Sequence, residues 1–134
     1  MTVAAPGRVE LKYNGQTVES GSAMWANGLT KTLSSACGVL AIYTDARGTV
    51  DDYQHGVLVS TSTGVVSDDT NWKCTNSYWT GMNSPTYDYS HWDQPTVLGA
   101  NDGSYATVVT SVSAQAKWIW TGPTPTVRCR ITFC

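Results

Sequence analysis

A chain of 134 residues with 13% charged side chains and many Ser, Thr, Gly, Val and Tyr residues fits one all-β domain with a sizeable core. Eight basic residues against ten acidic ones provide no basic field for a nucleic-acid backbone. No apolar run approaches the roughly 20 residues that span a bilayer, so we expect no membrane insertion. The polar start MTVAAPGR is not a signal peptide, and secretion would therefore need a leader that precedes it.

The first third of the chain predicts a hairpin followed by a core strand. Residues 8–19 (RVELKYNGQTVE) alternate apolar and polar side chains around Asn14-Gly15, a strong hairpin signal. They predict a strand, a type I′ turn and a second strand. Residues 20–31 predict a polar loop, and residues 32–45 contain the apolar run CGVLAIYT, which predicts a strand of the core.

The middle of the chain is richer in loops. Residues 46–55 (ARGTVDDYQH) predict a loop with adjacent aspartates, and GVLVSTSTGVV predicts a strand with a turn near Gly64. Residues 65–97 hold three of the six tryptophans, show no helical periodicity, and carry Gly81, Pro85 and Pro95. A long aromatic loop is uncommon unless it is functional or held by packing. We therefore expect this segment to build a core edge or to line a binding surface.

The last third predicts three strands. Residues 95–104 carry a turn around Asn101-Asp102-Gly103, and residues 105–114 alternate Val with Thr and Ser, which is typical of a half-buried strand. Residues 117–121 (KWIWT) and 126–133 (TVRCRITF) predict two more strands joined by a Pro-rich connection. About seven or eight short strands without a helix indicate a β-sandwich.

The four cysteines (Cys37, Cys74, Cys129 and Cys134) lack the CxxC spacing of zinc or redox sites. They are disulfides or buried thiols, and two disulfides could pair in three ways that the sequence does not distinguish. Cys134 is the last residue, so it could also form a disulfide with a second chain.

Several short pieces, in this order, resemble the galactose-binding-domain-like jelly rolls that occur as sugar-binding modules of glycosidases and in animal extracellular proteins. They are Tyr-Asn-Gly at 13–15, GVLAIYT at 38–44, GVLVS at 56–60, Ser-Asp-x-x-x-Trp-Lys-Cys at 67–74, aromatic-Asp-x-Ser-x-Trp at 87–92, AKWIWT at 116–121 and Cys-Arg-x-Thr-Phe at 129–133. A freestanding module of this size is similar to the galactose-specific lectins of sea anemones and other marine invertebrates. The resemblance implies a single all-β jelly-roll lectin domain over residues 1–134, a homodimer, and calcium that can hold the sugar.

The resemblance also separates structural residues from functional candidates. Residues of the shared pattern are expected to be core aromatics or turn-fixing polar groups: Trp72, Trp92, Trp118, Asp68, Asp88 and Ser90. Residues that depart from the pattern are the better functional candidates: the loop 51–55, Tyr89, His91, Asp93, Asn101 and Asp102.

A galactoside offers an apolar face, which an aromatic ring can cover, and a hydroxyl pair, which polar side chains or a calcium ion can bind. The loop DDYQH contains two carboxylates, a ring, an amide and an imidazole in five residues. We predict sugar binding by Tyr53, Gln54, His55, Trp79 and Tyr105, and calcium binding by Asp51, Asp52, Asn101 and Asp102. The alternatives are a solvated loop at 51–55, a simple turn at 101–103, and core or rim positions for Trp79 and Tyr105.

These features predict an extracellular, non-enzymatic lectin for terminal galactose or β-galactosides that is calcium-assisted and haemagglutinating as a dimer. Both glutamates, Glu10 and Glu19, flank the first hairpin, and no Gly-x-Ser-x-Gly motif or histidine cluster indicates catalysis. Two alternatives stay open: an extracellular structural or protein-binding module of the same fold, or an accessory sugar-binding domain of a glycosidase.

Overall fold

The structure, a computed structural model, describes residues 1–4, 8–22, 29–30, 32, 38–45, 56–77, 81–82, 84, 86–106, 108–122 and 126–133. Within these ranges the chain forms strands and turns, and none of it is a helix long and apolar enough to cross a membrane. The strands are β1 (Thr2–Ala4), β2 (Arg8–Tyr13), β3 (Gln16–Ser22), β4 (Leu29–Thr30), β5 (Gly38–Asp45), β6 (Leu58–Ser60), β7 (Lys73–Thr75), β8 (Thr96–Ala100), β9 (Lys117–Trp120) and β10 (Thr126–Phe133). The prediction of an all-β fold is confirmed.

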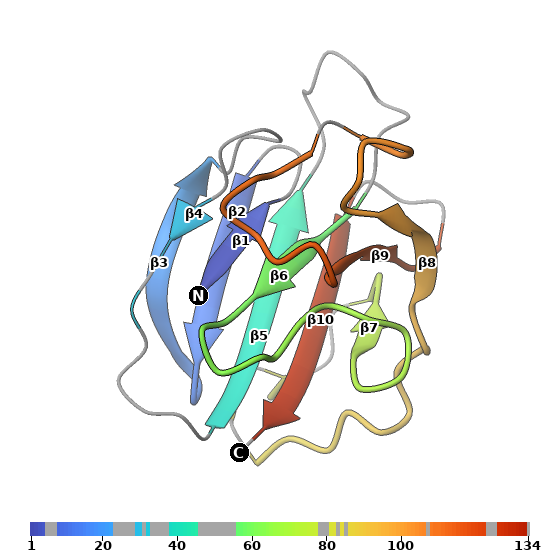
Figure 1. Ribbon diagram of the computed structural model, residues 1–134. Helices are drawn as coiled ribbons and strands as arrows, with labels where there is room; N and C mark the ends of the chain where they lie inside the picture. The colour runs from blue at the N-terminus through green and yellow to red at the C-terminus, as the bar shows by residue number, and fades with distance from the viewer. Residues whose placement is uncertain are drawn as a thin grey trace.

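The larger sheet has the strand order β3-β2-β5-β10-β7, with every pair antiparallel (Figure 1). Along each of its strands, successive side chains point to opposite faces of the sheet, so side chains two residues apart share one face. Leu11 of β2, Ile42 of β5 and Cys129 of β10 lie on the inner face and are almost fully buried. The side chains between them lie on the outer face, where the candidate site forms.

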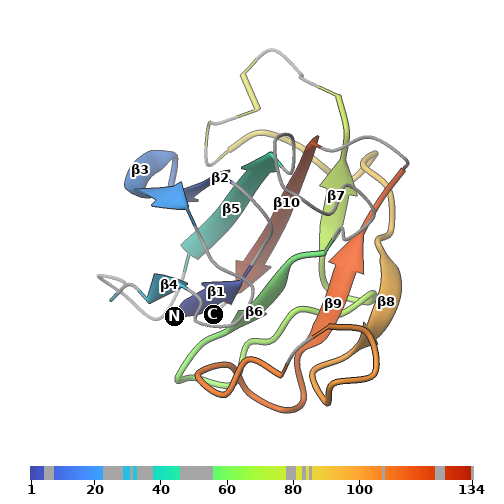
Figure 2. The ribbon, with the colours of Figure 1, turned by 90° about the horizontal axis from the view of Figure 1, so that it is seen from above.

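A second layer covers the inner face of this sheet (Figure 2). It consists of the sheet β4-β1-β6 and the pair β8-β9, which are connected by an antiparallel bridge between Val57 and Ile119. Val3 of β1 and Val59 of β6 join the inner side chains of β2, β5 and β10 in one buried cluster. Two antiparallel layers with a shared apolar core are consistent with the predicted β-sandwich.

The predicted first hairpin is present. Asn14 and Gly15 have positive φ angles of 52° and 85°, as both central residues of a type I′ turn require, and Tyr13 pairs with Gln16 across the turn. The Asn14 side chain also fixes the neighbouring strand, since its Oδ1 accepts a hydrogen bond of 2.9 Å from the Val39 amide. The core strand predicted for the run CGVLAIYT within residues 32–45 is found as β5, and the strands predicted at 117–121 and 126–133 are found as β9 and β10.

The prediction of a strand at 105–114 is wrong, because the described part of this segment contains turns, bends and irregular backbone and no strand. Val109 and Val112 are both buried, three residues apart, in a small cluster with Leu58 and Trp118. The Asn101 side chain bonds the backbone groups of Val109 and Val112 that a ladder would otherwise use. Four strands lay outside the predicted ones: β1, β4, β7 and β8.

A disulfide between Cys74 of β7 and Cys129 of β10 joins two directly opposed residues of the larger sheet. It lies in the buried core cluster and holds the edge strand β7 to β10. Cys74 also exchanges two backbone hydrogen bonds with Asp93, so the far end of the segment 76–95 is fixed to the same point. Cys37 and Cys134, including the predicted intermolecular bond, lie outside the described residues.

Removal of this disulfide should therefore cost much of the stability. The bond closes a loop with a sequence separation of 55 residues, for which the chain-entropy model gives about 4 kcal/mol. In guanidinium unfolding, the free energy of unfolding of a C74A/C129A double variant should fall by roughly this amount. Cys37 and Cys134 stay unchanged in this variant, so the difference reports on the Cys74–Cys129 bond. A loss below about 1 kcal/mol would show that the bond does not restrain the unfolded chain.

Candidate functional site

The structure places only three of the residues predicted for sugar or calcium binding. Asn101, Asp102 and Tyr105 lie in the turn after β8. The other predicted residues lie outside the described residues: Asp51, Asp52, Tyr53, Gln54, His55 and Trp79. That the loop 51–55 lies beside the turn at 101–103 therefore stays a prediction.

Asn101 has a structural role in the fold. Its side chain is 4% exposed, and its Nδ2 donates hydrogen bonds to the carbonyl oxygens of Val109, Val112 and Ser113 at 3.0, 3.2 and 3.3 Å. Its Oδ1 accepts the Val109 amide at 2.9 Å. The amide thus fixes the turn-rich segment 108–113, and this use does not fit a ligand of a calcium ion.

The neighbouring residues Asp102 and Tyr105 also make contacts within the protein. The exposed Asp102 carboxylate accepts the Ser104 amide at 2.9 Å, and hydrogen bonds from the Ser104 hydroxyl and amide lower the pKa of Asp102. Tyr105 packs beside Trp118, with ring centroids 6.2 Å apart, and lies so close to Gly99 that a Cβ there would meet it at 2.5 Å. Among the described residues, no three His, Cys, Asp or Glu side chains form a cluster that could hold a metal ion.

The role of Asn101 can be tested by a near-isosteric change. N101D removes the Nδ2 donor and aims a carboxylate at three carbonyl oxygens, so it should destabilise the protein by roughly 2–4 kcal/mol. The matched control is D102N one residue later, whose side chain can still accept the Ser104 amide, and which should leave the thermal midpoint unchanged. Equal midpoints for N101D and the wild type would contradict the structural role.

A pocket lies instead on the outer face of the larger sheet. Two cross-strand rows of side chains form its surroundings: Glu10, Tyr43 and Arg128 in one row, and Lys12, Ala41 and Arg130 in the next. Ala41 lies between the long side chains of Lys12 and Arg130, so its small side chain leaves a depression in the middle of the second row. The pocket has a volume of about 200 Å³ and is lined by Glu10, Lys12, Ala41, Ile42, Tyr43, Met82, Trp92, Arg128 and Arg130.

Met82 and Trp92, from the described part of the segment 76–95, form one wall of this pocket. The coloured part of the segment 76–95, yellow in Figure 2, lies beyond the larger sheet, on the side away from the second layer. Arg130 holds it there: the Nη1 atom donates to the Met82 carbonyl at 2.7 Å and the Nη2 atom to the Ser84 carbonyl at 3.1 Å. The guanidinium carbon also lies 4.7 Å from the ring centroid of Tyr89, whose hydroxyl contacts the Thr132 hydroxyl at 2.8 Å.

Two buried N–H groups that belong to lining residues have no hydrogen-bond partner in the described structure. They are Nε of Arg130, a residue that is 1% exposed, and Nε1 of Trp92, a residue that is 4% exposed. Burial also lowers the pKa of the Arg130 guanidinium, with the Tyr89 and Tyr87 hydroxyls acting in the opposite direction. Buried polar groups are normally paired, so unpaired donors beside a pocket are candidates for ligand contacts.

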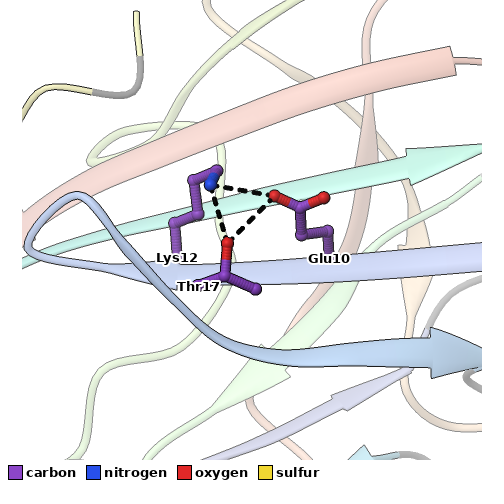
Figure 3. A network of polar contacts seen from close by, with 3 residues as sticks. All are labelled: Glu10, Lys12 and Thr17. Carbon is purple, nitrogen blue, oxygen red and sulfur yellow. Dashed lines mark hydrogen bonds and ion pairs between the residues drawn. The ribbon is translucent and has the colours of Figure 1, made fainter.

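The opposite wall carries a small polar network. Lys12 forms an ion pair with Glu10 at 3.0 Å and donates to the Thr17 hydroxyl at 2.8 Å, and Thr17 in turn donates to Glu10 at 3.3 Å (Figure 3). The Arg128 guanidinium lies over the Tyr43 ring, 4.3 Å from its centroid. The pocket therefore presents aromatic surface beside guanidinium, ammonium and carboxylate groups.

The residues of the shared pattern have the expected structural roles, with one correction. The Asp68 carboxylate accepts the amides of Thr70 and Asn71, and Asp88 accepts the Ser90 amide at 2.9 Å. Hydrogen bonds from the Ser90 hydroxyl and amide lower the pKa of Asp88. Trp72 and Trp118 are fully buried within the sandwich.

Trp92 is the correction. It is buried as expected, but it packs against Tyr87 and Tyr89 on the outer face of the sheet and lines the pocket, outside both apolar clusters of the interior. Tyr89 and His91, two of the residues that depart from the pattern, belong to the same segment 76–95 but do not line the pocket. Tyr89 covers Arg130, and the exposed His91 lies 3.5 Å from the Tyr87 hydroxyl.

Sequence reasoning missed the sheet face as a site. The signal was the alternation in TVRCRITF: Val127, Cys129 and Ile131 read as the core face, which places Arg128 and Arg130 together on the other face. Two arginines on one face of a strand paired on both sides are unusual, because charged residues are seldom buried without a partner.

Comparison of the chain with models of protein families, with curated proteins and with solved structures gave no match in any of the three.

Proposed function

We propose that this protein is a secreted, non-enzymatic lectin that binds galactose-terminated glycans, with the outer-face pocket as its sugar site. The observation that carries the proposal is the joint presence of aromatic rings and hydrogen-bonding groups in one pocket. Tyr43 and Trp92 offer surface for the C–H face of a sugar, and Arg128, Glu10 and Lys12 offer partners for its hydroxyls. The choice of galactose, and of a jelly-roll topology, rests on the resemblance to invertebrate lectins.

The size of the pocket suits one sugar ring. Sites for drug-sized ligands usually have volumes of roughly 300–1,000 Å³. A volume of about 200 Å³ is smaller and favours a single terminal monosaccharide over a buried oligosaccharide. A shallow site for one ring binds weakly by itself, so avidity through a dimer supports useful agglutination. An intermolecular disulfide through Cys134 is one way to form that dimer.

The lining supports binding rather than hydrolysis. Glycoside hydrolysis commonly needs two opposed carboxyl groups. Among the described residues, Glu10 is the one carboxylate that lines the pocket, and it is paired with Lys12. A protein-binding module would instead expose an apolar patch, whereas Val108 is the one large hydrophobic side chain that the described residues expose, at 39%.

The lectin proposal predicts that the pure dimer agglutinates red cells and that galactose or lactose blocks agglutination. Y43A should reduce galactose affinity at least tenfold in calorimetry, because the ring that borders the pocket is lost. Y105A is the matched control, since it removes a tyrosine that was also a predicted platform but lies away from the pocket; circular dichroism should confirm that both variants fold.

Silence of the wild-type protein on a glycan array, together with no agglutination, would contradict the lectin proposal. Loss of affinity in Y105A with full affinity in Y43A would keep the lectin proposal and move the sugar site to the turn after β8.

Calcium assistance is a separate prediction, since it rests on Asp51 and Asp52 in the Asp-rich loop. If an ion bridges the protein and the sugar, dialysis against EDTA should weaken galactose binding at least tenfold, and added calcium should restore it. The thermal midpoint measured in parallel separates a bridging ion from a purely structural one. Equal affinity with and without EDTA would refute the bridging ion.

A further inference from the structure

The pocket is strongly cationic for a protein whose formal net charge is −2. Its described lining contains three cationic side chains (Lys12, Arg128 and Arg130) and one carboxylate (Glu10). Neutral galactose gains little from such an excess of positive charge, because hydroxyls are recognised equally well by neutral amides and hydroxyls. The excess of cationic side chains therefore indicates a ligand with negative charge, which the aromatic rings alone do not indicate.

The two arginines hold that excess charge. Lys12 and Glu10 form a 3.0 Å ion pair, and Arg128 and Arg130 are the other two charged residues of the described lining. These lie two residues apart on β10, on the same face, so their side chains emerge roughly 7 Å apart along the strand. That spacing lets both guanidinium groups approach a single substituent of a sugar ring in the pocket.

Arg130 is the more unusual of the two. It is 1% exposed, and no described carboxylate pairs with it. Its contacts include the neutral carbonyls of Met82 and Ser84 and the rings of Tyr89 and Tyr87. Its Nε–H has no partner within the described structure. A buried cation without a counter-charge is costly, and an anion that enters the pocket would lower that cost.

The chemistry of guanidinium groups indicates the kind of anion. Arginine binds planar or tetrahedral oxyanions through parallel N–H···O bonds and is preferred over lysine for this purpose. On a sugar, such an oxyanion is the carboxylate of an acidic sugar or a sulfate ester. A nucleic-acid backbone would need an extended row of cations, whereas here the cations are confined to one pocket.

We propose that the outer-face pocket selects sugars that carry an oxyanion, with Arg128 and Arg130 as the residues that recognise it and Tyr43 and Trp92 as the surface for the ring. This inference rests on the proposed function and names its ligand class: an acidic or sulfated galactose-type sugar binds better than galactose itself. Arg130 has a second, structural task, because it also holds the segment 76–95 in place.

The test compares three monosaccharides of the same ring configuration by calorimetry: galactose, galacturonic acid and galactose 6-sulfate. Both anionic sugars differ from galactose only at C6. At least one of them should bind the wild-type protein about tenfold more tightly than galactose, the effect of one or two charge-assisted hydrogen bonds. The preference should fall as the salt concentration rises. A preference for galacturonic acid identifies a carboxylate ligand, and a preference for galactose 6-sulfate identifies a sulfated one.

Variants connect the preference to the pocket. R128Q should reduce the preference for the anionic sugar over galactose to less than threefold, because the ratio of the two affinities isolates the loss of the charge from the loss of any hydroxyl contact. R128K should retain most of the preference. K117Q removes an exposed cation on β9, in the other layer, and should behave as the wild type. R130M is a second variant, but R128Q decides the question if R130M does not fold.

Galactose affinity equal to or above that of both anionic sugars would overturn this inference and leave the lectin proposal standing. An anionic preference that R128Q and R130M both retain would also overturn it, because the charge would then be read elsewhere. If none of the three sugars binds and the glycan array is silent, the proposed function itself fails.

Discussion

A guanidinium group that is almost completely removed from water must be solvated by the protein, and in this molecule Arg130 is solvated by a loop. Its two terminal nitrogens bond the carbonyls of Met82 and Ser84, and the Tyr89 ring covers it. The described residues of the segment 76–95 form turns, bends and irregular backbone apart from the bridge of Asp93 to Cys74, so these contacts help to fix where they lie. Arg130, in the middle of a strand, therefore holds Met82 in the wall of the pocket, while Trp92 of the same wall packs against Tyr87 and Tyr89.

The same strand also carries the core and the disulfide. Along β10, Val127, Cys129 and Ile131 are buried against the second layer, and Cys129 is bonded to Cys74 of β7. Arg128 and Arg130 occupy the alternate positions. Because alternation along a strand is strict, a shift of one residue in the pairing of β10 would exchange the core and the site, so the register is strongly specified.

The sequence predicted the parts of the fold that local chemistry determines. Asn14-Gly15 specified a turn that only residues with positive φ adopt easily, and the apolar alternation of β5 and β10 specified their inner faces. The prediction failed at 105–114, where Val residues are interspersed with Thr and Ser, but the buried Val109 and Val112 are three residues apart, which is not the spacing of one strand face. The side chain of Asn101, up to twelve residues away in sequence, supplies hydrogen bonds that the pattern does not reveal. Strands of two or three residues, such as β4 and β7, were missed because pairing across the sheet defines them, not their own composition.

The candidate site was harder to predict for a related reason. Motif reasoning favoured loops rich in Asp and aromatic residues, since loops commonly carry binding residues. The pocket in the described structure combines strands β2, β5 and β10 with a distant loop, and its depth comes from the small side chain of Ala41 between Lys12 and Arg130. A sequence shows that two arginines share a face of a strand, but only the pairing of three strands shows that an alanine separates them from a lysine. The positive charge of the pocket thus arises from the register in which β2, β5 and β10 pair. It is a property of the fold and does not depend on which ligand the outer face binds.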